Sequence, residues 1–279
     1  MSYKTILACL THEDAAQRLM PAACWLADRH DAHLIGLHVE ETIAIYRNVG
    51  MQVHGEVFEA FNERVSARRE ATRAVFEQAV ARANVRGEWQ VDYASTLDSG
   101  DTVMRRGATA DLIVALQKGP DDGAQNHRLV ERLIAGSGQP VLVIPREGGH
   151  ERVGTRVVIA WDGGREAAAA VRAALPFIEQ AEDVLIVVLN ERSKPATEMA
   201  SVGHNLATAL SRHGAHATVE HHPSHAKSVA HTLLDRARGH GADLLVMGAF
   251  SHSRVHDLVF GSATGETLQD ADLPVLWGR

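Results

Sequence analysis

The sequence is poor in the residues that mark secreted or membrane-bound proteins. It has two cysteines in 279 residues, Cys9 in a strand-like run and Cys24 on the apolar side of a helix-like run. Without C-x-x-C spacing, both read as reduced core thiols. Apolar runs stay short of the roughly 18 residues that a membrane span needs, and the first one breaks too early for a signal peptide. We therefore expect a cytoplasmic protein that does not enter a membrane.

Basic residues are fewer than acidic residues. Lys and Arg number 28 against 35 Asp and Glu, which gives a formal net charge of -7. Nucleic acids and anionic membranes attract basic surfaces, so neither is an expected partner. Aromatic residues make up 5% of the chain, but the hydrophobic fraction of 45% is ample for a packed core. The length indicates two domains of about 140 residues each.

The same succession of apolar runs occurs in both halves of the chain. The matching pairs are residues 4–14 with 155–166, 110–116 with 242–248, and 139–145 with 273–279. These short continuous runs alternate with segments of helical spacing, as parallel strands buried under helices do. Each half is predicted as β-α-β-α-β-α-β-α-β. The polar, glycine-bearing stretch 146–154 joins them, so the predicted domains are 1–148 and 154–279.

The first half carries an insertion before its third strand. Within residues 42–83, apolar residues from Phe58 to Ala79 have mostly helical spacing and predict a long amphipathic helix with an extra loop. Packing on the sheet is favoured over a role as a lid or a partner-binding surface. The tyrosine, methionine and valines of residues 45–53 are candidates to face a ligand or a second subunit.

Two loops of the second half have the composition of a ligand site. Asp162 ends a strand before two glycines, and Gly248 ends another strand before a basic loop. In open parallel sheets, ligands bind beyond the carboxyl ends of the strands where the strand order reverses. A carboxylate such as Asp162 accepts hydrogen bonds from a base or a ribose. Each residue, taken singly, also fits a purely structural role as a cap or a turn.

The basic loop ends in a predicted phosphate cradle. Gly261 and Ser262 open the last helix, where unpaired N–H groups and the helix dipole favour an anion. The Ser262 and Thr264 hydroxyls add direct contacts, and Arg254 supplies a positive charge, with His252 and His256 as further candidates.

These loops resemble those of the universal stress protein family. The family motif G-x2-G-x9-G-(S/T) matches Gly248, Gly261 and Ser262, and Ser251 stands at the second glycine. That serine either narrows the phosphate path or adds a hydroxyl contact. Asp162 matches the family's strand-ending aspartate. The second half thus resembles one universal stress protein domain, and the whole chain resembles the tandem, two-domain form.

The resemblance implies a fold and a ligand. The fold is α/β, with two tandem Rossmann-like domains similar to adenine nucleotide alpha hydrolases, each a five-stranded parallel sheet flanked by helices. Asp162 and the backbone around Leu189 would meet adenine, and Gly248 and Ser251 the ribose and phosphates. Gly261, Ser262 and Thr264 would meet the phosphates of ATP or a related adenine nucleotide, with or without magnesium. The last strands of the two halves, within 139–145 and 273–279, are expected to pair.

The first half lacks this motif. Thr11 stands where the aspartate belongs, and His127 and Arg128 occupy the places of Gly261 and Ser262. We expect no nucleotide there.

The expected function is a stress response or signalling role, exerted through nucleotide-dependent conformation and an unidentified protein partner. A homodimer is a further expectation. No catalytic residue is expected, because the common loop and elbow motifs of nucleotide-dependent enzymes and hydrolases are absent. The alternatives are a scaffold of the same fold that binds no nucleotide, and a weak ATPase. We expect the histidines between 213 and 225 to lie on the surface rather than to form a metal site.

Overall fold

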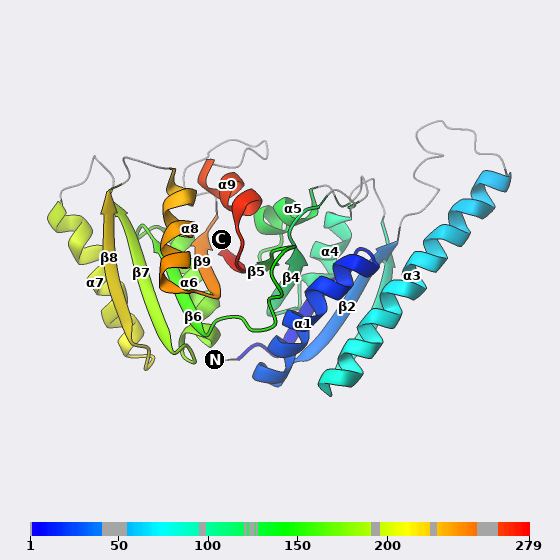
Figure 1. Cartoon of the computed structure of the whole chain (residues 1–279), viewed down its shortest axis with the longest axis horizontal. Coiled ribbons are helices and arrows are strands. Elements are labelled where there is room, and N and C mark those ends of the chain that lie inside the picture. Colours follow the sequence, from blue (N-terminus) through cyan, green and yellow to red (C-terminus); the bar gives the residue numbers. More distant parts are fainter. Residues whose placement is uncertain are drawn as a thin grey trace. The chain divides into compact units, whose positions relative to one another are not determined.

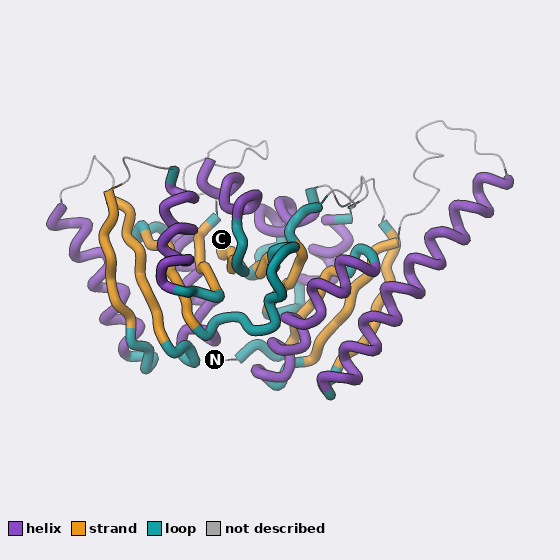
Figure 2. Tube along the Cα trace, viewed as in Figure 1, coloured by secondary structure: helices purple, strands orange, loops and turns teal. Residues whose placement is uncertain are grey.

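The structure is a computed structural model that describes residues 2–40, 55–94, 99–119, 122, 126, 128–190, 196–223, 228–249 and 262–279. The chain divides into two compact units, Tyr3–Gln139 and Pro140–Arg279. In each unit, helices lie along the strands of a sheet (Figures 1 and 2). The predicted alternation of five strands with helices holds in both halves of the described chain. The α/β class is therefore confirmed.

The unit Tyr3–Gln139 has four parallel strands in the order β3-β2-β1-β4. These strands are β1 (Thr5–Cys9), β2 (His33–Glu40), β3 (Gly87–Tyr93) and β4 (Leu112–Leu116). The helices are α1 (Glu13–His30), α3 (Gly55–Ala83), α4 (Gly100–Gly107) and α5 (Leu129–Gly136). Helix α1 packs against α3, and α4 packs against α5.

The long helix predicted in the first half is α3, and a glycine of the sheet lets it pack closely. A Cβ atom on Gly36 of β2 would lie 2.5 Å from Cδ2 of Phe76, which is a buried residue of α3. Residues 45–53 lie outside the described residues, so their predicted role is not tested.

The unit Pro140–Arg279 has six strands in the order β5-β10-β9-β6-β7-β8. They are β5 (Val141–Ile144), β6 (Arg156–Trp161), β7 (Asp183–Asn190), β8 (Ala217–Pro223), β9 (Leu244–Gly248) and β10 (Val275–Gly278). The helices are α6 (Arg165–Ile178), α7 (Ala196–Ser211), α8 (Val229–His240) and α9 (Ser262–Asp270). Strand β5 is antiparallel to β10, with Val143 opposite Val275, and the other pairs are parallel. The expected pairing of the two last strands is confirmed.

An aspartate repeated in both halves ties two strands together at their amino ends. The Asp243 carboxylate, just before β9, accepts backbone N–H groups at the start of β6, namely those of Gly154, Thr155 and Arg156, at 2.8 to 3.1 Å. Asp111, just before β4, accepts the N–H groups of Lys4 and Thr5 at 2.7 and 2.9 Å. The recurring Ala-Asp-Leu sequence therefore encodes the same strand connection twice.

The cysteines are reduced and buried, as predicted. Burial raises the pKa of the Cys9 thiol to about 12 and that of Cys24 to about 11. Both thiols therefore stay protonated at neutral pH and behave as small apolar side chains. Among the described helices, none combines the length and the apolar character that crossing a membrane requires.

Candidate functional site

The predicted ligand loops lie at the switch point of the unit Pro140–Arg279. Strand β6 pairs with β9 on one side and with β7 on the other, so the chain order reverses between β6 and β9. Because the three strands are parallel, their carboxyl ends share one edge of the sheet. Asp162 directly follows β6, Gly248 ends β9, and Leu189 is the second-last residue of β7. The fold therefore brings these three predicted residues to one edge.

Asp162 shapes the turn into α6 and keeps one oxygen atom available. Its Oδ1 accepts the N–H of Gly164 at 2.7 Å, and Gly163 takes a φ of +76° that favours glycine. Among the described residues, its Oδ2 has no hydrogen-bond partner. The structural role and the predicted ligand contact are thus compatible, since they use different oxygens.

Gly248 allows a helix backbone to approach the sheet. A Cβ atom at this position would lie 2.5 Å from the backbone nitrogen of Ala167 and 2.6 Å from the carbonyl carbon of Glu166, both in the first turn of α6. Gly278 of β10 makes a similar approach, since a Cβ atom there would collide with Cα of Ala170. Close packing of α6 on the sheet thus accounts for a glycine at 248 without any ligand.

Helix α9 begins where the phosphate cradle was predicted. Its first residue is Ser262, and Thr264 in its first turn is 4% exposed. The rest of the predicted cradle is not described, because Ser251, Arg254 and Gly261 lie outside the described residues, as do His252 and His256. The roles predicted for these residues, and for the Ser262 side chain, stay predictions.

Two neighbours of this edge were not singled out from the sequence. The indole N–H of Trp161, the last residue of β6, donates to the carbonyl oxygen of Val202 in α7 at 3.1 Å. Glu166 is 8% exposed and accepts a hydrogen bond from Arg165 at 2.6 Å. Burial raises the pKa of the Glu166 carboxyl, but the Arg165 contact and neighbouring charges outweigh burial and hold the pKa below its usual value. Glu166 therefore places a negative charge in the first turn of α6.

These two residues were missed for physical reasons. Trp161 reads in the sequence as one more apolar strand residue, and its partner is 41 residues away. Glu166 reads as an ordinary acidic residue of a first helical turn, a common position for solvated carboxylates. The proximity of Gly248 to α6 is what brings Glu166 to this edge.

Two histidines of the predicted cluster lie near carboxylates. His213 lies 3.3 Å from Glu179, and His222 lies 3.0 Å from Glu220. Within the described part of the chain, no group of three potential ligands is arranged to hold a metal ion. His225 lies outside it.

The second half of the chain matches one family model, and the whole chain is similar to known proteins. Residues 155–277 match the model of the Universal stress protein family. Universal stress protein Slr1230 of Synechocystis sp. is 25% identical over 303 residues, covering 99% of this chain and 100% of that protein. A universal stress protein of Archaeoglobus fulgidus has a similar fold, with a TM-score of 0.75 at 13% identity, covering 100% of this chain and 97% of that one.

Proposed function

We propose that the second half of the chain, predicted as the domain 154–279, binds an adenine nucleotide. In support, residues 155–277 match the model of the Universal stress protein family, and the whole chain is similar to a universal stress protein. The observation that carries this proposal is Asp162, whose Oδ2 lacks a partner among the described residues at the switch point of the sheet. Carboxylate oxygens accept hydrogen bonds, and the amino group of adenine donates them.

The start of α9 at Ser262 supports the second part of the proposal, that phosphates bind beside Gly248. Helix N-termini offer unpaired N–H groups and a positive dipole end to anions. ATP, with or without magnesium, is the proposed ligand. Binding would change the conformation of the protein and so the surface that it offers to a protein partner in a stress response. A second copy of the chain is a further proposed partner.

Calorimetric titration of the full chain with ATP and magnesium, after removal of any copurified nucleotide, tests the proposal. We expect about one ATP per chain. Asp162→Asn keeps an oxygen for the Gly164 N–H but loses the charge, so it should weaken binding about tenfold, the scale of one charged hydrogen bond. Thr11→Ala, at the matching position of the first half, is the control and should leave the affinity unchanged.

The titration also separates the alternatives. Absence of binding to nucleotide-free protein would contradict the proposal and leave a scaffold of the same fold as the better account. Steady release of ADP and phosphate during the titration would instead indicate a weak ATPase.

A further inference from the structure

The unit Tyr3–Gln139 has its own switch point, at the carboxyl ends of β1 and β4. Strand β1 pairs with β2 on one side and with β4 on the other, so a ligand crevice is expected between the loops that leave β1 and β4. A cavity of about 10 Å³ remains there, lined in part by Thr11, Lys118, Asp122 and Asn126. This volume is about what one water molecule needs. The crevice is therefore filled largely by side chains of the chain itself.

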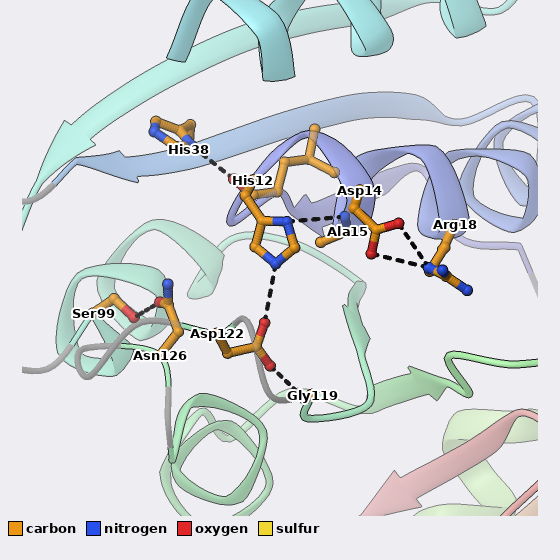
Figure 3. Close-up of polar contacts among 10 residues, drawn as sticks. His12, Asp14, Ala15, Arg18, His38, Ser99, Gly119, Asp122 and Asn126 are labelled. Carbon is orange, nitrogen blue, oxygen red and sulfur yellow. Dashed lines mark hydrogen bonds and ion pairs between the residues drawn. The ribbon is translucent and has the colours of Figure 1, made fainter. Parts of the chain in front are cut away.

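The Asp122 carboxylate bridges the two loops (Figure 3). Its Oδ2 accepts the N–H of Gly119, which follows β4, at 2.7 Å. Its Oδ1 lies 3.3 Å from Nε2 of His12, which follows β1. The Asp122 and His12 side chains are 9% and 15% exposed. An anionic group thus sits, largely buried, at the place where an open sheet of this kind takes a ligand.

His12 connects this carboxylate to the amino end of α1. Its Nδ1 accepts the N–H of Ala15 at 3.3 Å, so His12 is the N-cap of the helix. Because Nδ1 accepts, the ring proton lies on Nε2 and is donated to Asp122. The positive end of the α1 dipole favours a negative charge near its first turn. The His12 ring thereby links the carboxylate to the amino end of the helix.

A further hydrogen bond joins the loop after β4 to the start of α4. The Ser99 hydroxyl, at the start of α4, donates to Oδ1 of Asn126 at 2.6 Å (Figure 3). Ser99 is 1% exposed and Asn126 is 8% exposed. Buried hydrogen bonds of this kind fix the position of a loop, because breaking one leaves polar groups unpaired.

From this geometry we propose that Asp122 is an autoinhibitory residue, an internal anion that occupies the crevice of the first unit and excludes phosphate-bearing ligands from it. The carboxylate uses the Gly119 N–H and the His12 ring as donors, and these donors would otherwise be available to a phosphate. Its negative charge also repels an incoming anion in an environment of reduced dielectric constant. The proposal does not depend on nucleotide binding in the second unit.

Asp122→Ala in the full chain, titrated with inorganic phosphate at constant ionic strength, tests the proposal. The readout is the pair of assigned backbone amide resonances of Gly119 and Ala15. We expect saturable shifts in the variant, with an apparent dissociation constant at least about tenfold below that of the unsubstituted chain. The proposal is overturned if the variant responds no better than the unsubstituted chain, or if the unsubstituted chain already binds as tightly.

Two further variants make the test specific. Asp101→Ala removes a carboxylate that pairs with Arg132 in the same unit and changes the net charge equally, and it should give no response at Gly119. Asp122→Asn keeps an acceptor for the Gly119 N–H, and it replaces the alanine variant in the titration if that variant does not fold. It should bind phosphate more tightly than the unsubstituted chain, and equal affinity would overturn the proposal. Because the resonances belong to the first unit, failure here is distinct from a failure to bind ATP.

Discussion

At the scale of single residues, aspartates at strand ends have opposite roles at the two edges of the sheet. Asp111 and Asp243 lie at the amino ends, where they accept two and three backbone N–H groups and tie neighbouring strands. Asp162 and Asp122 lie at the carboxyl ends, where parallel sheets bind ligands. Asp162 keeps one oxygen available among the described residues, whereas both oxygens of Asp122 are engaged. The same residue type therefore supports the fold at one edge, and by the two proposals above it governs ligand access at the other.

Buried His30 makes stability depend on pH. Its ring is 2% exposed, with its centroid 5.0 Å from that of Tyr3, and burial, together with Arg29 and Lys4, lowers its pKa to about 4. The unfolded chain binds the proton at its ordinary pKa near 6.5, so it takes up protons between pH 6.5 and 4 while the folded chain does not. Stability contributed by neutral His30 is therefore lost as the pH falls through this range.

We expect the unfolding free energy of the first unit to drop by about 2 kcal/mol between pH 7 and pH 5 through this histidine. Urea denaturation at the two pH values measures the drop. His30→Phe should remove most of it, since phenylalanine does not titrate. His33→Gln replaces the partly exposed histidine that begins β2, three residues after His30, and this variant should retain the drop. An equal drop in the phenylalanine variant would assign the pH dependence to other groups.

At the scale of elements, helix α6 is positioned by two glycines on neighbouring strands. Gly248 and Gly278 lie opposite each other in the β9–β10 pairing, and both approach the α6 backbone. This contact places the first turn of α6, with Glu166, beside the end of β9. The position of α6 therefore depends on the absence of side chains at these two strand positions.

Gly248→Ala tests this dependence. The added Cβ would meet backbone atoms of α6 at 2.5 to 2.6 Å, and backbone yields less readily than a side chain. We expect the unfolding free energy to fall by about 2 kcal/mol, the usual cost of overpacking. Gly239→Ala is the matched control: it lies in α8, its added Cβ would meet the end of the Arg236 side chain at 3.2 Å, and it should stabilise slightly. The urea midpoints of both variants measure these changes in stability. Unchanged stability of Gly248→Ala would contradict the packing account.

Periodicity predicted the order of elements because strand and helix repeats are local properties of the sequence. It also located Asp162 and the start of α9, since a polar residue or a glycine interrupts an apolar run at each. The sequence did not show why residue 248 is a glycine, because glycine has no side chain that would indicate whether a ligand or a helix lies nearby. Asp122 was missed because it lies in an aperiodic loop and its partner His12 is 110 residues away. Contacts between distant loops leave no local pattern.

At the scale of the whole molecule, the linker and the limit of the compact units fall at different places. The sequence places the boundary in the polar stretch 146–154, where turn-forming residues are dense. The compact units separate between Gln139 and Pro140. Strand pairing explains the difference, since β5 precedes the linker but pairs with β10 of the second half. The predicted limits 1–148 and 154–279 can be tested by measuring whether fragments cut at these limits fold.

Fragments of the second half provide that test. Residues 140–279 retain β5, whereas 154–279 leave one edge of β10 unpaired, although its residues Val275, Leu276 and Trp277 are at most 2% exposed in the full chain. An unpaired apolar edge strand associates with other chains. Because β5 covers this edge of β10, we expect 154–279 to form dimers or larger species to a greater extent than 140–279.

Light scattering coupled to size exclusion measures the association, and urea denaturation should show 154–279 to be less stable by about 3 kcal/mol through the lost burial and hydrogen bonds of β5. A third fragment, 146–279, keeps the linker without β5 and should behave as 154–279 does. If 154–279 is monomeric and as stable as 140–279, the pairing with β5 adds nothing to the fold of the second half. In that case the limit read from the sequence is the better one.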